Sequence, residues 1–341
     1  MMRYHIDSTA GGHIQGWAFH ESGRPIEAEA WVSGRQVGRA VHVERPDVVA
    51  AYPCAPHQSG FVIPFEAPAT LTASVEVRFL PTRETVTVTV LHPAYARYLR
   101  AAWSHCHFVR DYFPAHNATS ISEKDAGAMP NSPDEMIAII NHLYCLKSEG
   151  CTGEFAEFGC FKGFSTSMLS YACELLGLRM HVFDSFAGLP PSDSTVYIPG
   201  EFKGTLDEVR ENVRIFGAPD VVTYHKGFFS DTLPTFDCPR LISLWMDVDL
   251  ESSARDVMTV FPNVDQRGAV FSHECDAPCF IGGVHQEPGP NFVIPPIMKA
   301  YADSGAKIEG RYISGSTGAF WRRDGIAVMP NDVLLGLLAG D

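Results

Sequence analysis

Short runs of alternating apolar and polar residues fill the first part of the chain. AEAWVSG, GRAVHV, SGFVIPFE, ASVEVRF and TVTVTV each show the period of two that is typical of half-buried strands, and Gly, Pro and Ser turns separate them. Five or six such strands at regular spacing predict a small antiparallel β-sandwich over residues 1–92.

The pattern becomes helical from Pro93 onward, where PAYARYLRAAWSHCHFVRDYF begins. In NSPDEMIAIINHLYCLKSEG, Ser132 is a helix N-cap, Pro133 takes the first helical position, and Glu135 completes a capping box. We therefore expect a helical connector and cap over residues 93–150.

Strands and helices alternate through residues 151–341. We expect strands at 155–159, 180–184, 221–225, 241–247 and 269–272, helices at 165–176, 206–216, 252–261 and 294–302, and a closing hairpin at 308–313 and 318–323. This order predicts an α/β class with a doubly wound, seven-stranded, Rossmann-like sheet. Ligands of such sheets bind beyond the carboxyl ends of the strands, so polar residues at those ends are candidates for a site.

Composition narrows the class of protein. The chain has 341 residues, of which 45% are hydrophobic, and this suits two globular domains. A net charge of -14 argues against a nucleic-acid partner. Because there is no long apolar stretch and no secretory signal at the amino terminus, and because the nine cysteines form no C-x-x-C pair, we expect a cytoplasmic protein without membrane partners.

The segment EFAEFGCFKGFST combines an acid with two glycines between a strand and a helix. Glu157, Gly159 and Gly163 form E-x-G-x-x-x-G, followed by Ser165 in the first helical turn. Glycine allows close approach of a ligand, and the free N–H groups at a helix start favour an anion such as a carboxylate. The spacing differs from the dinucleotide and triphosphate motifs and suits S-adenosylmethionine better. The alternative is an ordinary connection between strand and helix.

The next two strand ends provide partners for a nucleoside. Asp184 can accept two hydrogen bonds from a ribose diol, unless it only caps a turn. Gly227 permits close approach after the third strand, Phe228 or Phe229 can stack on a purine, and Ser230 or Asp231 can reach the purine amino group. The commoner role of such phenylalanines is in a core.

Three acidic residues and a histidine follow the fourth and fifth strands. Asp247 and Asp249 come after one strand, and His273 and Glu274 after the next. Such ligands suit a divalent ion such as Mg²⁺, which would acidify a substrate hydroxyl. Asp247 or His273 can instead be a general base without metal. A third reading makes Asp249 a helix cap and leaves the other pair on the surface.

Five motifs in order resemble the macrocin O-methyltransferase-like family. They are EFGCFKGFSTSMLSYA, VFDSFAGLPPSD, TLDEVRENVRIFG, GFFSDTLP and MDVDLESSARDVMTVFPNVDQRGAVF, and the similarity runs from about residue 130 to residue 323. The resemblance implies an S-adenosylmethionine-dependent class I methyltransferase that methylates hydroxyls of natural-product sugars.

The resemblance also implies roles for single residues. The cofactor would be bound by Glu157, Gly159, Gly163, Ser165, Asp184, Ser185, Gly227, Phe228, Ser230 and Asp231. Asp247 matches the family's metal-binding aspartate. Where relatives carry an Asp-Asp pair, this chain has His273 and Glu274, so the metal set becomes Asp247, His273 and Glu274, or else the enzyme works without metal with His273 as base.

We therefore expect an O-methyltransferase acting on a sugar or other natural-product hydroxyl. The alternatives are methylation of an amine or carboxylate, and a non-catalytic scaffold that binds the cofactor. Residues 1–92 are similar to small β-sandwich modules attached to some bacterial carbohydrate-modifying enzymes, for which a structural, dimerising or binding role is open.

Overall fold

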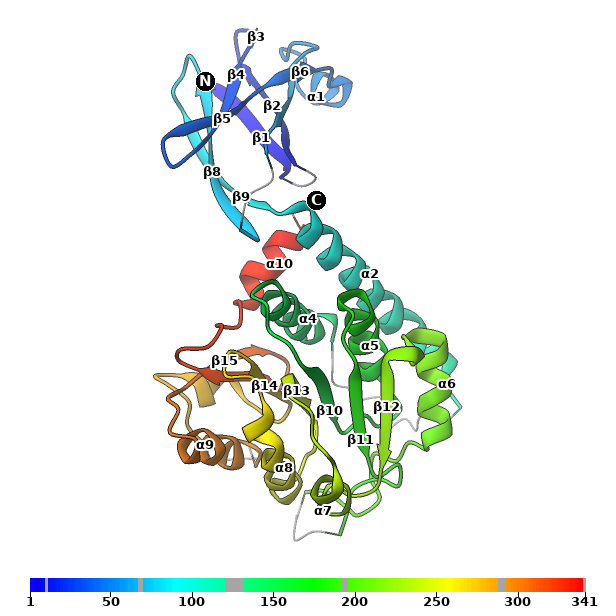
Figure 1. Cartoon of the computed structure of the whole chain (residues 1–341). Coiled ribbons are helices and arrows are strands. Elements are labelled where there is room, and N and C mark those ends of the chain that lie inside the picture. Colours follow the sequence, from blue (N-terminus) through cyan, green and yellow to red (C-terminus); the bar gives the residue numbers. More distant parts are fainter. Residues whose placement is uncertain (10–11, 67–69, 120–131, 192–195, 288–291, 340–341) are drawn as a thin grey trace. The chain divides into compact units, whose positions relative to one another are not determined.

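The computed structural model describes residues 1–9, 12–66, 70–119, 132–191, 196–287 and 292–339 (Figure 1). The chain divides into two compact units, one of Met1–Arg100 with the last segment from Leu335, and one of Ala101–Leu334. The division falls inside α2 (Pro93–His116) and not at its start, where the sequence pattern changes. No helix among the described residues has both the length and the apolar character needed to cross a membrane.

Two antiparallel sheets form the first unit. One contains β1 (Met2–Ser8), β2 (His13–His20), β3 (Arg24–Pro25), β6 (Val41–Val43) and β7 (Gly60–Pro64); the other contains β4 (Glu27–Val32), β5 (Arg35–Arg39), β8 (Thr72–Leu80) and β9 (Thr85–Leu91). α1 (Pro46–Ala51) precedes β7. Side chains from both sheets, such as Phe61 and Phe79, share one buried core, as the alternating pattern predicts for a sandwich.

A seven-stranded sheet forms the centre of the second unit. Its order is β12 (Val222–Lys226), β11 (Met180–Asp184), β10 (Glu154–Phe158), β13 (Leu241–Met246), β14 (Ala269–Ser272), β16 (Thr317–Arg322) and β15 (Ile308–Ser314). The first five strands are parallel, and the last two form an antiparallel hairpin. This topology confirms the predicted doubly wound, Rossmann-like class.

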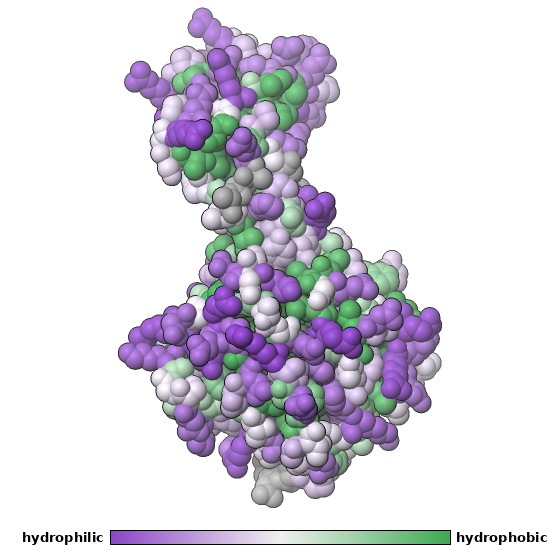
Figure 2. All heavy atoms as spheres, viewed as in Figure 1, coloured by the Kyte–Doolittle hydropathy of each residue, from purple (hydrophilic) through white to green (hydrophobic). Residues whose placement is uncertain are grey.

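Helices connect the strands of this sheet. They are α5 (Phe164–Leu176), α6 (Leu206–Phe216), α7 (Phe229–Thr232), α8 (Glu251–Val257) and α9 (Ile294–Asp303); α4 (Pro133–Ser148) precedes the first strand of the sheet, and α10 (Asn331–Ala339) follows the last. The predicted capping box of Ser132 and Glu135 is present at the start of α4. The helix expected over residues 252–261 is shorter, because after Val257 the chain tightens into a 3₁₀ segment that contains Pro262. Figure 2 shows a surface on which hydrophilic residues predominate.

The ends of β10 and β13 approach each other very closely at Gly159. The Asp247 N–H donates to the Phe158 carbonyl at 2.9 Å, and the Gly159 N–H donates to the Phe183 carbonyl at 2.9 Å. Gly159 has φ +83°, and a Cβ there would lie 2.0 Å from the carbonyl oxygen of Asp247. Only glycine fits, so the turn after β10 and the loop after β13 are held side by side.

Gly159→Ala should therefore destabilise the second unit by more than the cost of placing an alanine in left-handed backbone. A suitable control is Gly177→Ala, because Gly177 also has positive φ but a Cβ there would meet nothing within 4 Å. We expect the control to lose about 1–2 kcal/mol of unfolding free energy and Gly159→Ala to lose more, measured by chemical denaturation. Equal losses would show that the close approach is not the constraint.

Candidate active site

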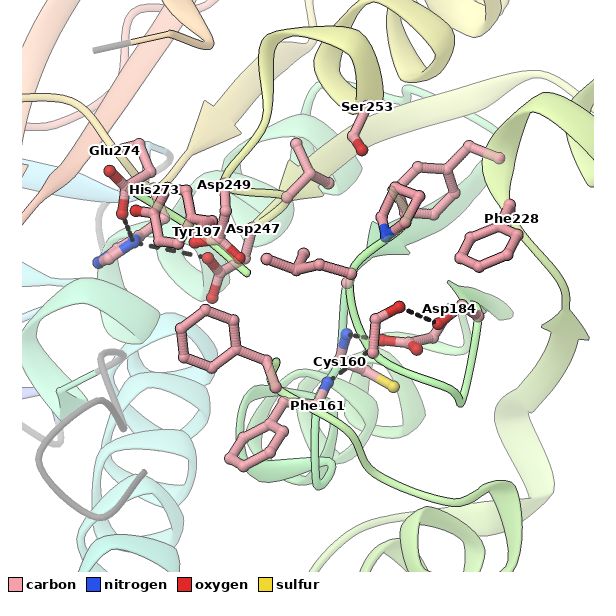
Figure 3. Close-up of a pocket in the computed structure, with 18 of the residues that line it drawn as sticks. Cys160, Phe161, Asp184, Tyr197, Phe228, Asp247, Asp249, Ser253, His273 and Glu274 are labelled. Carbon is pink, nitrogen blue, oxygen red and sulfur yellow. Dashed lines mark hydrogen bonds and ion pairs between the residues drawn. The ribbon is translucent and has the colours of Figure 1, made fainter. Parts of the chain in front are cut away.

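A cavity of about 1000 Å³ lies at the carboxyl ends of the parallel strands (Figure 3). The turns after five successive strands of the sheet contribute to its lining, as expected for a doubly wound fold. The lining residues from these turns include 159–161, 184–185, 228–231, 247–249 and 273–274. The structure thus brings together most of the residues that the sequence predicts.

Glu157 lies beneath the cavity and does not line it. Its side chain is fully buried, and its two carboxylate oxygens accept hydrogen bonds of 2.6 Å from Ser165 Oγ and Thr166 Oγ1. These bonds fix the first turn of α5 against the end of β10. Burial raises the pKa of Glu157 to about 8, although the two hydroxyl donors oppose the shift.

Asp184 joins two turns of the site. Oδ2 accepts from the N–H groups of Cys160 and Phe161 at 2.9 and 3.3 Å, and Oδ1 accepts from Phe186 N–H at 2.7 Å. Burial raises its pKa against the opposing effect of these donors. A carboxylate has about four acceptor positions, so roughly one remains for a ligand such as a ribose. The neighbouring Ser185 lines the cavity while its hydroxyl donates to the Gly188 carbonyl at 2.7 Å.

The turn after β12 forms an aromatic and polar wall. Phe228, Ser230 and Asp231 line the cavity. Phe229 also lines it but packs edge-on against buried Phe158, at 5.9 Å between ring centres, so the core role considered for the phenylalanines applies to Phe229. Two predicted glycines, Gly163 and Gly227, are not among the lining residues and instead permit left-handed backbone next to it.

Asp247, His273 and Glu274 converge on one another at the opposite side of the cavity. His273 Nδ1 lies 3.5 Å from Asp247 Oδ1 and 3.3 Å from Glu274 Oε1, and the three side chains are only 13%, 17% and 15% exposed for His273, Asp247 and Glu274. Burial of the imidazole opposes its protonation, but the two carboxylates outweigh this and raise the pKa of His273 to about 9. His273 therefore carries a positive charge at neutral pH.

Asp249 lies next to Asp247, His273 and Glu274, but its carboxylate has different surroundings. Within the described part of the chain, no hydrogen bond or ion pair to its carboxylate is found. Burial, together with the nearby Asp247 and Glu274 carboxylates, raises its pKa well above the ordinary value. The reading of Asp249 as a helix cap is wrong, because α8 begins after Leu250 without a side-chain cap.

Asp249 and Glu274 also share an unusual backbone conformation, with φ of +58° and +59°. Left-handed backbone is costly for residues other than glycine, and such strain is concentrated at functional sites. Phe161, which lines the cavity from the glycine turn, has φ of +49°.

The described residues contain no group of three or more His, Cys, Asp and Glu side chains arranged to hold a metal ion. At the predicted position, His273 Nδ1 lies 3.5 Å from the Asp247 carboxylate and 3.3 Å from the Glu274 carboxylate. The described residues therefore do not support the divalent metal expected at these three positions.

Sequence reasoning missed Glu135 as a residue of the cavity. Glu135, found only as part of the capping box, also lines it, and its Oε1 accepts from Thr317 Oγ1 at 2.8 Å. No local motif marks this role, because only the tertiary structure brings Glu135 to the site. Tyr197 and Phe202 line the cavity from the loop after β11, with ring centres 6.1 Å apart; the length of this loop already indicates from the sequence that it can reach over the site, and part of it, 192–195, lies outside the described residues.

Comparison with known proteins finds similarity to methyltransferases over the part of the chain that forms this site. Residues 134–277 match the family described as Macrocin-O-methyltransferase (TylF). Over 200 residues the chain is 26% identical to an 8-demethyl-8-(2,3-dimethoxy-alpha-L-rhamnosyl)-tetracenomycin-C 4'-O-methyltransferase of Streptomyces olivaceus, covering 53% of this chain and 71% of the relative. Over 163 residues it is 28% identical to the mycinamicin III 3''-O-methyltransferase of Micromonospora griseorubida, covering 41% and 64%.

Among solved structures, the O-methyltransferase NovP is 22% identical with a TM-score of 0.46, covering 56% of this chain and 80% of NovP. The family match and the two relatives confirm the predicted resemblance and the prediction of a methyltransferase enzyme. Residues 1–92 lie outside the family match.

The buried carboxyl of Glu157 should make stability depend on pH. Its folded pKa of about 8 exceeds the unfolded value of 4.5, so the folded state holds a proton that the unfolded chain releases. The contribution of Glu157 to the unfolding free energy should be highest below pH 4.5 and fall by up to about 1.4 kcal/mol per pH unit until the pH passes the folded pKa.

Glu157→Gln should remove the pH-dependent contribution of Glu157 to the unfolding free energy. The difference in unfolding free energy between variant and wild type should therefore grow from pH 5 to pH 8. The exposed Glu211, whose pKa is lowered by Arg214, provides the control Glu211→Gln, which should follow the wild-type curve. Thermal or urea unfolding at a series of pH values measures both. Parallel curves for Glu157→Gln and wild type would contradict a raised pKa at this position.

Proposed function

We propose that the chain binds S-adenosylmethionine across the strand ends and transfers its methyl group to a hydroxyl of a small natural-product acceptor, such as a sugar. The observation that carries the proposal is a single cavity with two chemically different ends, an aromatic and polar end at Phe228 and Asp231 and an acidic end at Asp247 and Asp249. The methyltransferase family match covers the turns that form both ends. The relatives named above methylate glycosylated natural products.

The residues of the cavity fit this cofactor. Its volume of about 1000 Å³ lies at the upper end of the range of roughly 300–1000 Å³ for ligand pockets, which suits a cofactor together with an acceptor. In this arrangement Phe228 offers a face for the purine, Asp231 an acceptor for its amino group, and Asp184 its remaining acceptor position for the ribose. Bound S-adenosylmethionine would supply an electrophilic methyl group on a positively charged sulfur.

The acidic end of the cavity provides the groups that act on the hydroxyl of the methyl acceptor. In the transfer, a bond forms between the acceptor oxygen and the methyl carbon, the carbon–sulfur bond breaks, and the hydroxyl proton passes to a carboxylate. We infer that Asp249 in its ionised form accepts this proton, because it lines the cavity and no hydrogen bond to its carboxylate is found among the described residues.

His273 and Asp247 have a supporting role in this proposal. His273 already carries a proton at neutral pH, so it suits the role of a fixed positive charge better than that of a base. Its interactions with Asp247 and Glu274 keep the loops after β13 and β14 together. Most of the rate enhancement would then come from holding the hydroxyl in line with the methyl group.

Asp249→Asn should lower methyl transfer by about 100- to 10,000-fold, the usual contribution of a general base, while leaving the affinity for S-adenosylmethionine nearly unchanged. Calorimetry measures the affinity, and release of S-adenosylhomocysteine over a panel of deoxysugar glycosides measures the transfer. Asp303→Asn is the matched control, because Asp303 is an exposed acid on α9 paired only with Lys299.

Asp247→Asn tests the assignment of the base. It removes a partner of His273 but leaves Asp249, so it should lower transfer less than Asp249→Asn does. The reverse order would return the base role to Asp247. Absence of S-adenosylmethionine binding to the wild type would refute the proposed function, and binding without turnover on any acceptor would favour the scaffold alternative.

A further inference from the structure

Glu135 is buried more deeply than its role in helix capping requires. It is only 3% exposed and lines the cavity, whereas Glu208, which completes the capping box of α6, is partly exposed. Glu135 Oε2 accepts from the Ser132 N–H at 2.6 Å, which is the capping contact. Oε1 accepts instead from Thr317 Oγ1 at 2.8 Å, and Thr317 is fully buried at the start of β16. The side chain thus has a second partner outside its own helix.

Only a carboxylate can make both contacts. Burying a carboxylate costs free energy, and a hydrogen-bond donor on each oxygen offsets part of that cost. A glutamine has a single acceptor oxygen, so it would leave either the Ser132 N–H or the Thr317 hydroxyl without an acceptor. The glutamate therefore joins the start of α4 to the strand pair β15–β16, although 182 residues separate Glu135 from Thr317.

The turn between β15 and β16 fits closely against this carboxylate. Gly315 lies in the turn with φ +57°, and a Cβ there would lie 2.4 Å from Glu135 Oε1. The next residue, Ser316, also lines the cavity, and its carbonyl accepts from the Cys275 N–H at 2.8 Å. Glu135 therefore contacts the turn, and the turn contacts the loop after β14.

The loop after β14 carries His273 and Glu274, and it is held from two sides. On one side the His273 N–H donates to the Met246 carbonyl of β13 at 2.9 Å. On the other side the N–H of Cys275 donates to the turn that Glu135 contacts. A displaced turn would therefore move the loop with its two cavity-lining side chains, while β13 would stay in place.

We propose that Glu135 is a positioning residue for the methyl transfer. Through Thr317 it holds the β15–β16 turn, and through the turn it keeps the loop after β14 where the acceptor hydroxyl meets the methyl group. The inference rests on the proposed function and adds to it a residue that takes no part in the proton transfer. A misplacement of about 1 Å can lower a rate by about 100-fold, so a contact behind the site can control the reaction. The purine end of the cavity at Phe228 belongs to a different strand and should not respond.

Replacement of Thr317 tests the contact. Thr317→Val removes the donor at nearly constant volume and should lower kcat/KM by about 10- to 100-fold, with the Kd of S-adenosylmethionine changed by less than about twofold. The acceptor is the deoxysugar glycoside that the wild type methylates fastest. Thr317→Ser keeps the hydroxyl, so its kcat/KM should stay within about threefold of the wild-type value.

Ser170→Ala is the matched control for the loss of a buried hydroxyl. Ser170 on α5 is fully buried, its Oγ accepts from the Ala218 N–H at 3.1 Å, and it is not among the residues that line the cavity. The control should therefore lower stability and leave methyl transfer unchanged. All variants are assayed at a temperature at which circular dichroism shows them to be folded.

Glu135→Ala completes a double-mutant cycle with Thr317→Val. If the two residues act through one contact, the double variant should be slower than the slower single variant by no more than about twofold. Fully additive losses in kcat/KM would show that the two residues act separately and would overturn the inference. If Thr317→Val does not fold, Glu135→Ala alone must show the loss of transfer with unchanged cofactor affinity.

The imidazole of His273 gives a readout that needs no acceptor. Its Cε1–Hε1 signal in the NMR spectrum, assigned by its absence in His273→Asn, should shift in Thr317→Val and stay in place in Thr317→Ser and Ser170→Ala. An unmoved signal in Thr317→Val overturns the inference, as does a Thr317→Ser variant that is as slow as Thr317→Val. A wild type that binds no S-adenosylmethionine refutes the proposed function instead, and the signal in the free protein then still decides whether Glu135 positions the loop.

Discussion

The close approach of Gly159 to the carbonyl of Asp247 is the constraint on which the rest of the site depends. It permits the N–H of Asp247 to bond Phe158 while the N–H of Gly159 bonds Phe183, so the ends of three neighbouring strands meet at one point. The turn that suits a methionine group and the loop that carries the acids are adjacent for this reason. A side chain at position 159 would push this turn and this loop apart. It would thereby separate the bound cofactor from the acceptor hydroxyl.

Acidic residues in this domain serve two different purposes, which burial and hydrogen bonding distinguish. Glu157 and Asp184 are buried and accept hydrogen bonds from α5 and from neighbouring turns, so they mainly shape the cavity. Asp249 has a carboxylate without such donors among the described residues, and it faces the cavity. We therefore assign the acceptance of the proton to Asp249, and not to Glu157 or Asp184.

Most of the second unit could be predicted from the sequence, because its strands are short apolar runs between clear turns. The bounds of β11 and α6 agree with the prediction, whereas α8 ends early because the chain tightens before Pro262. The raised pKa of His273 could not be predicted, since it depends partly on the Asp247 carboxylate, which a different strand brings within 3.5 Å.

Glu135 comes from a segment remote in sequence, and no spacing rule connects it with the strand ends. Residue types and the family resemblance predicted a metal site at Asp247, His273 and Glu274, whereas the structure shows the imidazole at ion-pair distance from both carboxylates.

A crystal structure of the complex with S-adenosylhomocysteine tests the central claim most directly. We expect the adenine to lie against Phe228 and the sulfur atom to lie above Gly159, directed toward Asp247 and Asp249. A cofactor bound elsewhere, or one whose sulfur points away from these acids, would contradict it.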